Sequence, residues 1–276
     1  MASASAARTI ATWREQYAEL MRSAFLVDLQ YRASIVIWLI WGITEPIISL
    51  GIWWSIAAGG AVDGYTQGAF ARYFFGVALV NQATLSWDAW NIDRWIREGE
   101  MNYRLTRPIA PIHEAVADNI AYKAPTSMII LMVWIVAAAF WPAVRIPFEP
   151  GRWALAIVAI VLAAAIRFLN GYATGLLAFW TTRATALVEL HYGLSLFLSG
   201  RIAPLSLLPP GVVHVAQYLW FPYMLSFPVE VLTGSVTTTA QYARGFAGQI
   251  VWLAIWMSIY LLVWKRGRRR YGAVGG

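Results

Sequence analysis

The feature that most constrains this chain is a series of apolar segments, each close to 20 residues long, that recur along the sequence. About 20 apolar residues are enough for a helix to cross a bilayer. Only 13% of the residues are charged, whereas a soluble domain carries about 25%. We therefore predict an all-α integral membrane protein. Its six expected transmembrane helices cover approximately residues 35–57, 70–90, 122–140, 153–180, 185–204 and 247–264.

The N-terminal region, residues 1–32, is predicted to be an amphipathic helix rather than a cleaved signal peptide. From Thr9 to Val27, apolar residues recur at helical spacing while charged residues occupy the opposite face. Such a helix is expected to lie in the membrane interface, with the side that carries Trp13 facing lipid. Residues 33–276 would then form one transmembrane domain.

Two further patterns predict the orientation. Residues 204–234 are apolar but are divided by prolines into pieces too short to cross, so we expect broken, re-entrant helices between spans 5 and 6. The chain ends in a basic cluster, residues 265–270, which belongs on the cytoplasmic side. We therefore predict a multi-pass protein of the plasma (inner) membrane with both termini cytoplasmic. Its basic residues would meet anionic lipids, and we expect no nucleic acid partner.

Several kinds of chemistry lack the residues they need. The sequence has no Cys and no GxxxxGK[ST] motif, so it offers neither thiol chemistry nor that phosphate-binding loop. His191 and His214 stand alone, without a partner at metal-ligand spacing. We expect no catalytic residue, no metal and no cofactor bound by this chain.

The most polar interval between two apolar segments is residues 93–119, a charged hairpin that we interpret as the surface on which a cytoplasmic partner acts. Within it, His113 and Asp118 match the HxxxxD spacing of glycerolipid acyltransferases, in which a histidine acts as general base. The companion motifs of those enzymes are missing. An integral membrane lipid acyltransferase is therefore the alternative function, and a stand-alone secondary transporter is another.

Two ionisable residues are expected inside the membrane at similar depth, Glu45 in span 1 and Arg167 in span 4. Unpaired charges are unfavourable there, so we predict an ion pair between them. Small residues four apart in span 4 share a stripe with Arg167 and predict close helix packing within the chain. They are Ala159, Ala163, Gly171 and Gly175.

The chain resembles the permease subunits of type-2 ABC exporters, and in particular a group of small six-span permeases. One matching patch runs from Arg97 through Gly99 and Met101 to Leu105 and Pro108. The other lies in the re-entrant region, and it comprises Ser199-Gly200, Pro204, Leu207, Pro209, Phe221-Pro222, Pro228 and Gly234.

The resemblance implies a permease that moves cargo but does not hydrolyse ATP. ATP and Mg would bind two copies of a separate ABC ATPase, and a second permease, identical or related, would complete a dimer. The apolar outer segment favours an amphiphilic or lipid-like cargo. The coupling residues would be Arg97, Glu98, Gly99, Glu100, Met101, Arg104, Leu105, Arg107 and Pro108, with Met101 and Leu105 facing the ATPase.

The same resemblance implies a transport path between two permease subunits, with an outer gate. The path would be lined by Asn81, Gln82, Thr84, Ser86, Ser195 and Ser199. Ordinary hydrogen bonds between helices are the alternative role for these polar residues. The outer gate would contain Pro204, Pro209, Phe221, Pro222 and Pro228.

Overall fold

The computed structural model describes residues 2–30, 32–181 and 183–271, without the side chains of residues 2–12, 32–35 and 41. Helices account for 81% of the chain, and the described part contains no strand, as the all-α prediction required. The principal helices are α1 (Ala2–Gln30), α2 (Arg32–Ala57), α3 (Gln67–Thr84), α4 (Asp88–Arg97), α5 (Glu100–Leu105), α6 (Pro111–Phe140), α7 (Pro150–Gly175), α8 (Ala184–Leu198), α9 (Pro210–Ala216), α10 (Phe221–Met224), α11 (Ser226–Thr233) and α12 (Thr239–Arg270).

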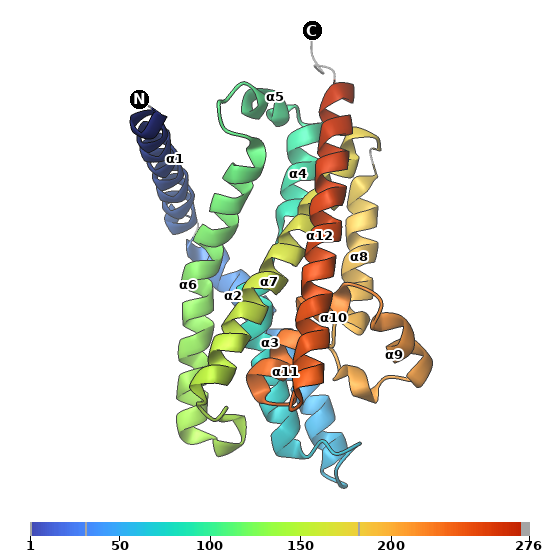
Figure 1. Cartoon of the computed structure of the whole chain (residues 1–276). Coiled ribbons are helices and arrows are strands. Elements are labelled where there is room, and N and C mark those ends of the chain that lie inside the picture. The colour runs from blue at the N-terminus through green and yellow to red at the C-terminus, as the bar shows by residue number, and fades with distance from the viewer. Residues whose placement is uncertain (1, 31, 182, 272–276) are drawn as a thin grey trace.

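The long helices run side by side between two ends of a bundle (Figure 1). The short helix α5 and the last turns of α12 lie at one end, which we call the inner end. The connections from α2 to α3 and from α6 to α7 lie at the opposite, outer end. The predicted hairpin and the basic tail are therefore at the same end of the molecule.

Four helices among the described residues are long and apolar enough to cross a membrane, namely those of α2, α6, α7 with its 3-10 extension, and α12. The predicted span 2 is not one continuous helix. It divides into α3 and α4, with a break at residues 85–87. Helix α8 has only 15 residues. Multiple membrane crossings are thus supported, while the count of six stays a prediction.

Two large apolar clusters and a smaller one, made of Ile166, Phe221 and Met224, lie among the described residues. The outer cluster contains Phe70 and Phe74 of α3 packed with Val229 of α11. The inner cluster contains Ile92 of α4 and Tyr172 of α7. Several polar residues of α3, α6 and α7 are buried as well. They are Asn81, Gln82, Thr84, Thr126 and Asn170, and we call them, together with Arg167, the polar layer.

The stripe of small residues on α7 packs within the chain, as predicted. Ala159 and Ala163 are fully buried, and the Gln249 side chain of α12 donates a 2.8 Å hydrogen bond to the Ala159 carbonyl. At Gly175 the neighbouring helix is closest, because a Cβ atom there would lie 2.7 Å from the Ala89 carbonyl oxygen of α4. Only glycine fits at this contact without moving backbone.

The predicted broken helices between spans 5 and 6 are present as α9, α10 and α11. Four residues proposed for the outer gate, Pro204, Phe221, Pro222 and Pro228, are buried inside the chain, whereas Pro209 is exposed. Buried prolines fix φ and lack a backbone donor that would need a partner. Helices α10 and α11 are therefore packed into the bundle, whereas much of α9 is exposed.

The amphipathic helix α1 contacts α6, a contact that the prediction did not include. Its Trp13 ring packs edge-on against His113 of α6, with centroids 5.6 Å apart, and the Tyr17 hydroxyl forms a hydrogen bond with the same imidazole. The expectation that the Trp13 side faces lipid stays a prediction, because Trp13 is 42% exposed although α6 covers part of this side. A polar ring on α6 offered this side of the helix a hydrogen-bond partner that lipid tails do not have.

The contact at Gly175 predicts a specific loss of stability. Replacement of Gly175 by Ala should lower the free energy of unfolding by about 1–3 kcal/mol, because the new methyl group must push α7 away from α4. The matched control is Gly193→Ala in α8, where a Cβ atom would meet nothing within 4 Å. Thermal unfolding of the purified chain in detergent measures both, and equal melting temperatures would contradict the prediction.

Candidate functional site

The charged hairpin contains a short helix held at an angle to its neighbours. Helix α4 ends at Arg97, and Gly99 then adopts the left-handed conformation, with φ of 78°, before α5 begins. Glycine takes this conformation without the clash that a Cβ atom would cause. Helix α6 starts after Ala110 with Pro111 in its first turn, a position that proline favours. Local sequence thus sets the three-part shape of the hairpin.

Ion pairs fix α5 to α6. Arg104 lies 2.9 Å from Glu100 within α5 and 3.2 Å from Glu114 of α6. Arg107, just beyond α5, lies 3.0 Å from the same Glu114 carboxylate. Because Glu114 is largely buried, these contacts are less screened than those of an exposed pair. Glu114 was not among the residues that the sequence pointed to for coupling.

Apolar contacts fix α5 to α4. The Arg104 guanidinium carbon lies 3.7 Å from the centroid of the Trp95 ring, a cation–π geometry. Met101 is fully buried with Ile92 and Trp95. The prediction that Met101 faces a partner is therefore wrong, because this side chain fills the space between α5 and α4. Burial of a methionine inside the chain supplies the packing that a six-residue helix needs.

The exposed side of α5 carries Tyr103 and Leu105, which are 62% and 39% exposed. Arg107 donates a 2.7 Å hydrogen bond to the Tyr103 hydroxyl, so this exposed ring has a fixed orientation. Arg97, Glu98 and Pro108 are also exposed around it. We call Tyr103, Leu105 and these three residues the inner face.

The inner face is also connected to α8 through α4. Asp93 of α4 is buried, and its Oδ2 atom forms an ion pair with Arg97 Nη2 at 2.6 Å. The same carboxylate oxygen accepts a 3.0 Å hydrogen bond from the Thr185 hydroxyl at the start of α8. Asp93 therefore ties the end of α4 to α8, a link that only the tertiary structure brings into view.

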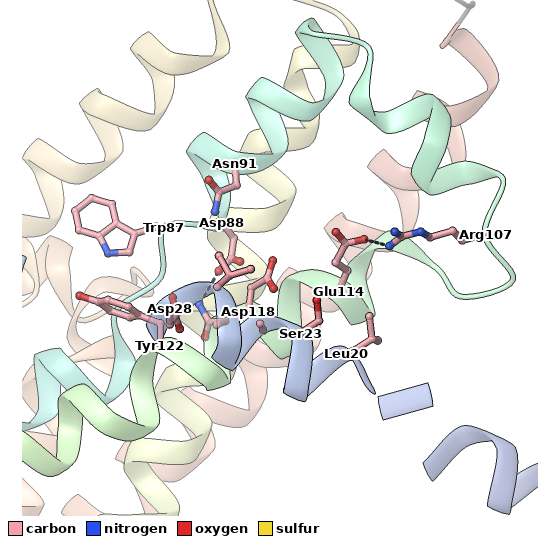
Figure 2. A pocket seen from close by; sticks show the side chains of 13 residues that line it. Leu20, Ser23, Asp28, Trp87, Asp88, Asn91, Arg107, Glu114, Asp118 and Tyr122 are labelled. Atoms are coloured by element: carbon pink, nitrogen blue, oxygen red, sulfur yellow. Dashed lines mark hydrogen bonds and ion pairs between the residues drawn. The ribbon is translucent and has the colours of Figure 1, made fainter. Parts of the chain in front are cut away.

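A cavity of about 430 Å³ lies beside the hairpin, between α1, α4 and α6 (Figure 2). Four carboxylates lie in its walls, together with apolar side chains such as Leu20 and Val27. Asp88 accepts hydrogen bonds from Ser86 and from Asn119, the latter 2.8 Å long. Burial raises the pKa of the Asp28 carboxyl above its ordinary value. The lining residues include Asp28, Asp88, Arg107, Glu114, Asp118 and Tyr122.

The HxxxxD pair does not form a catalytic dyad among the described contacts. His113 and Asp118 are five residues apart on α6, which places them on different faces of the helix. His113 packs against α1 through Tyr17, and Asp118 lines the cavity. In the part of the chain that the structure covers, no group of three His, Cys, Asp or Glu residues could hold a metal ion.

The intramembrane charges pair differently from the prediction. Glu45 of α2 lies 2.7 Å from Arg201, which follows α8. Arg167 instead donates hydrogen bonds to Asn81 (2.9 Å) and Thr84 (3.1 Å) of α3. The predicted Glu45–Arg167 ion pair is therefore wrong. Similar depth along two helices does not make their side chains neighbours, and the chain after α8 brings a second arginine to Glu45.

The polar residues expected to line a transport path lie inside the chain. Asn81 and Thr84 bind Arg167 as described, and Gln82 donates a 2.8 Å hydrogen bond to Thr126 of α6. Ser86 binds Asp88, and the Ser199 hydroxyl donates to the Ser195 carbonyl. These contacts agree with the alternative role, hydrogen bonding between and within helices. The transport path between two permease subunits stays a prediction.

Comparison with protein families gives a match over most of the chain. The family described as "ABC-2 family transporter protein" matches residues 34–275. A search of curated proteins gave no match.

The contacts of Glu114 predict how α5 is held. Replacement of Glu114 by Gln should weaken the contacts that Arg104 and Arg107 each make with this side chain. The expected cost is about 1–3 kcal/mol of local stability. Amide hydrogen exchange across residues 100–107, measured by mass spectrometry on the full chain, should then become faster. Glu149→Gln is the control, because Glu149 pairs 2.9 Å from Arg152 away from the hairpin. Unchanged exchange in residues 100–107 would count against the prediction.

Proposed function

The chain belongs to the ABC-2 family of transporter proteins, and from this premise we propose that it is the permease subunit of an ATP-driven exporter. The family points to a multi-pass membrane subunit of an ABC transporter, which works with an ABC ATPase. The finer assignment is ours. The chain would sit in the plasma membrane with both termini in the cytoplasm, and it would export an amphiphilic or lipid-like cargo.

The observation that carries this proposal is the inner face of α5. An exposed tyrosine and leucine stand on a helix that ion pairs and a buried methionine fix to α4 and α6. Aromatic residues with a fixed orientation are typical of the few side chains that dominate an interface. The sequence has no P-loop of its own, so a separate ATPase that docks here would supply the energy.

The structure suggests how such a docking event could act on the bundle. A push on α5 would be transmitted to α4 through Met101 and Trp95, and to α6 through Glu114. Because packed helices move as rigid bodies, α4 would carry the movement toward the break at residues 85–87. Two ATPase copies acting on two permease subunits would rock the halves against one another, with the cargo between them.

The outer segment fits the role of a gate in this proposal. Residues 204–234 pack into the bundle through Pro204, Phe221, Pro222 and Pro228. Gln249 of α12 donates a 3.0 Å hydrogen bond to the Tyr223 carbonyl. A movement of α12 relative to α7 would therefore displace this segment through the bond between Gln249 and Tyr223.

The proposal predicts that Tyr103→Ala weakens ATPase binding. Loss of a central tyrosine at an interface costs about 2 kcal/mol, which corresponds to roughly thirtyfold weaker association. Co-purification from native membranes, with ATPase identified by mass spectrometry and by ATP hydrolysis, gives the measurement. Tyr218→Ala is the matched control, because Tyr218 is 67% exposed in the outer segment.

Two results would contradict this function. The first is that no nucleotide-hydrolysing protein accompanies the unmodified chain. The second is equal ATPase recovery with Tyr103→Ala and with Tyr218→Ala.

A further inference from the structure

Arg201 is held in place by the backbone on either side of it. The Tyr73 hydroxyl of α3 donates a 2.7 Å hydrogen bond to the Gly200 carbonyl, and the Trp53 indole of α2 donates a 2.9 Å bond to the Ile202 carbonyl. Gly200 has φ of 83°, in the left-handed region. Hydrogen bonds from α2 and α3, together with the left-handed turn at Gly200, thus position Arg201, which is only 4% exposed.

The guanidinium of Arg201 has more donors than partners. Its Nη2 atom contacts Glu45 Oε2 at 2.7 Å. Its Nε and Nη1 atoms are buried and have no hydrogen-bond partner among the described residues. A guanidinium has five N–H donors in a planar fork suited to two-point binding of carboxylate or phosphate. Donors that are buried without a partner are unfavourable, so this fork is suited to an additional anionic acceptor.

The charge around Arg201 also favours an anion. Arg167 lies within electrostatic range of both Arg201 and Glu45, and its two hydrogen bonds go to the neutral side chains of Asn81 and Thr84. Two arginines therefore share one nearby carboxylate. The Glu45 side chain is 28% exposed, but its Oε1 atom is buried and has no hydrogen-bond partner among the described residues. A second anion would therefore have to displace this carboxylate from a buried position.

A row of aromatic rings leads from α2 to Arg201. Trp38 of α2 lies 5.1 Å from Trp87 in the break, and Trp87 lies 5.3 Å from Trp90 of α4. Trp90 lies 6.4 Å from Tyr192 of α8, and the Arg201 guanidinium lies 5.3 Å from the Tyr192 ring. None of the four rings is buried, and Trp38 is half exposed. The row gives an apolar surface next to a cationic group.

We propose that Arg201 binds the anionic group of an amphiphile, which displaces the carboxylate of Glu45, while the apolar part of the amphiphile lies on the row of aromatic rings. In the resting structure Glu45 occupies the anion position. The inference rests on the proposed transport function in taking this amphiphile to be the cargo class, and it adds that the cargo carries a phosphate or carboxylate group. An anionic membrane lipid offers the same chemistry.

The test is to measure, by calorimetry, the binding of dodecyl phosphate to the purified full chain in an uncharged maltoside detergent. The unmodified chain should bind dodecyl phosphate and should not bind dodecyltrimethylammonium. Arg201→Gln should weaken binding at least about tenfold, the usual effect of losing a charge-assisted hydrogen bond. Glu45→Gln should strengthen binding, because the competing carboxylate is gone. Arg183→Gln, an exposed arginine before α8, should leave binding unchanged.

The double variant Glu45→Gln with Arg201→Gln separates site loss from misfolding, because it leaves no unpaired buried carboxylate. It should melt like the unmodified chain and still not bind. Failure of the unmodified chain to bind, or weaker binding by Glu45→Gln, would overturn the inference. Competition by phosphatidylglycerol nanodiscs would identify a membrane lipid as the source of the anion, and lack of competition would identify a transported amphiphile.

These measurements need no ATPase, so the two proposals can fail separately. A chain that binds dodecyl phosphate but recruits no ATPase would contradict only the transport function. A chain that recruits an ATPase through Tyr103 but does not bind dodecyl phosphate would contradict only the anion site.

Discussion

A positive charge inside an apolar helix bundle has to be stabilised by the protein around it, and the arrangement at the middle of this molecule follows from that constraint. Arg167 lies between Ile166 and Phe168, which belong to two different apolar clusters, and α3 supplies Asn81 and Thr84 as neutral hydrogen-bond partners. Glu45 remains available to Arg201. The packing of α3 against α7 thus provides the partners of the Arg167 guanidinium. The position of the chain after α8 provides the contact between Arg201 and Glu45.

The break between α3 and α4 connects this polar layer to the inner end. Helix α3 ends at Thr84, whose hydroxyl binds Arg167, and α4 begins at Asp88 only four residues later. Helix α4 then reaches α5 through one left-handed glycine. A displacement at the hairpin is therefore separated from the buried charges by one ten-residue helix and two short turns. This short connection gives physical content to the idea that a cytoplasmic partner can influence the membrane interior.

The two proposals place different demands on the same elements. Docking at the inner face needs α5 to be rigid, and Arg104, Met101 and Glu114 provide this through a cation–π contact, a buried side chain and ion pairs. Anion binding needs one contact to be replaceable, and the partly exposed Glu45 provides that. Rigid transmission and an exchangeable ion pair are compatible because they use different elements: the exchangeable pair joins α2 to the chain after α8, whereas the rigid contacts join α5 to α4 and α6.

The sequence by itself determined the all-α membrane class, the position of the hairpin, the turn at Gly99 and the proline-broken outer segment. These features depend on apolar run length and on local backbone preferences, which neighbouring residues decide. Only the tertiary structure decided which buried groups meet. It turned Met101 inward, paired Glu45 with Arg201 rather than Arg167, and brought Glu114 to α5. Such contacts depend on the rotation of each helix and on chain segments far apart in sequence, and no local pattern encodes either.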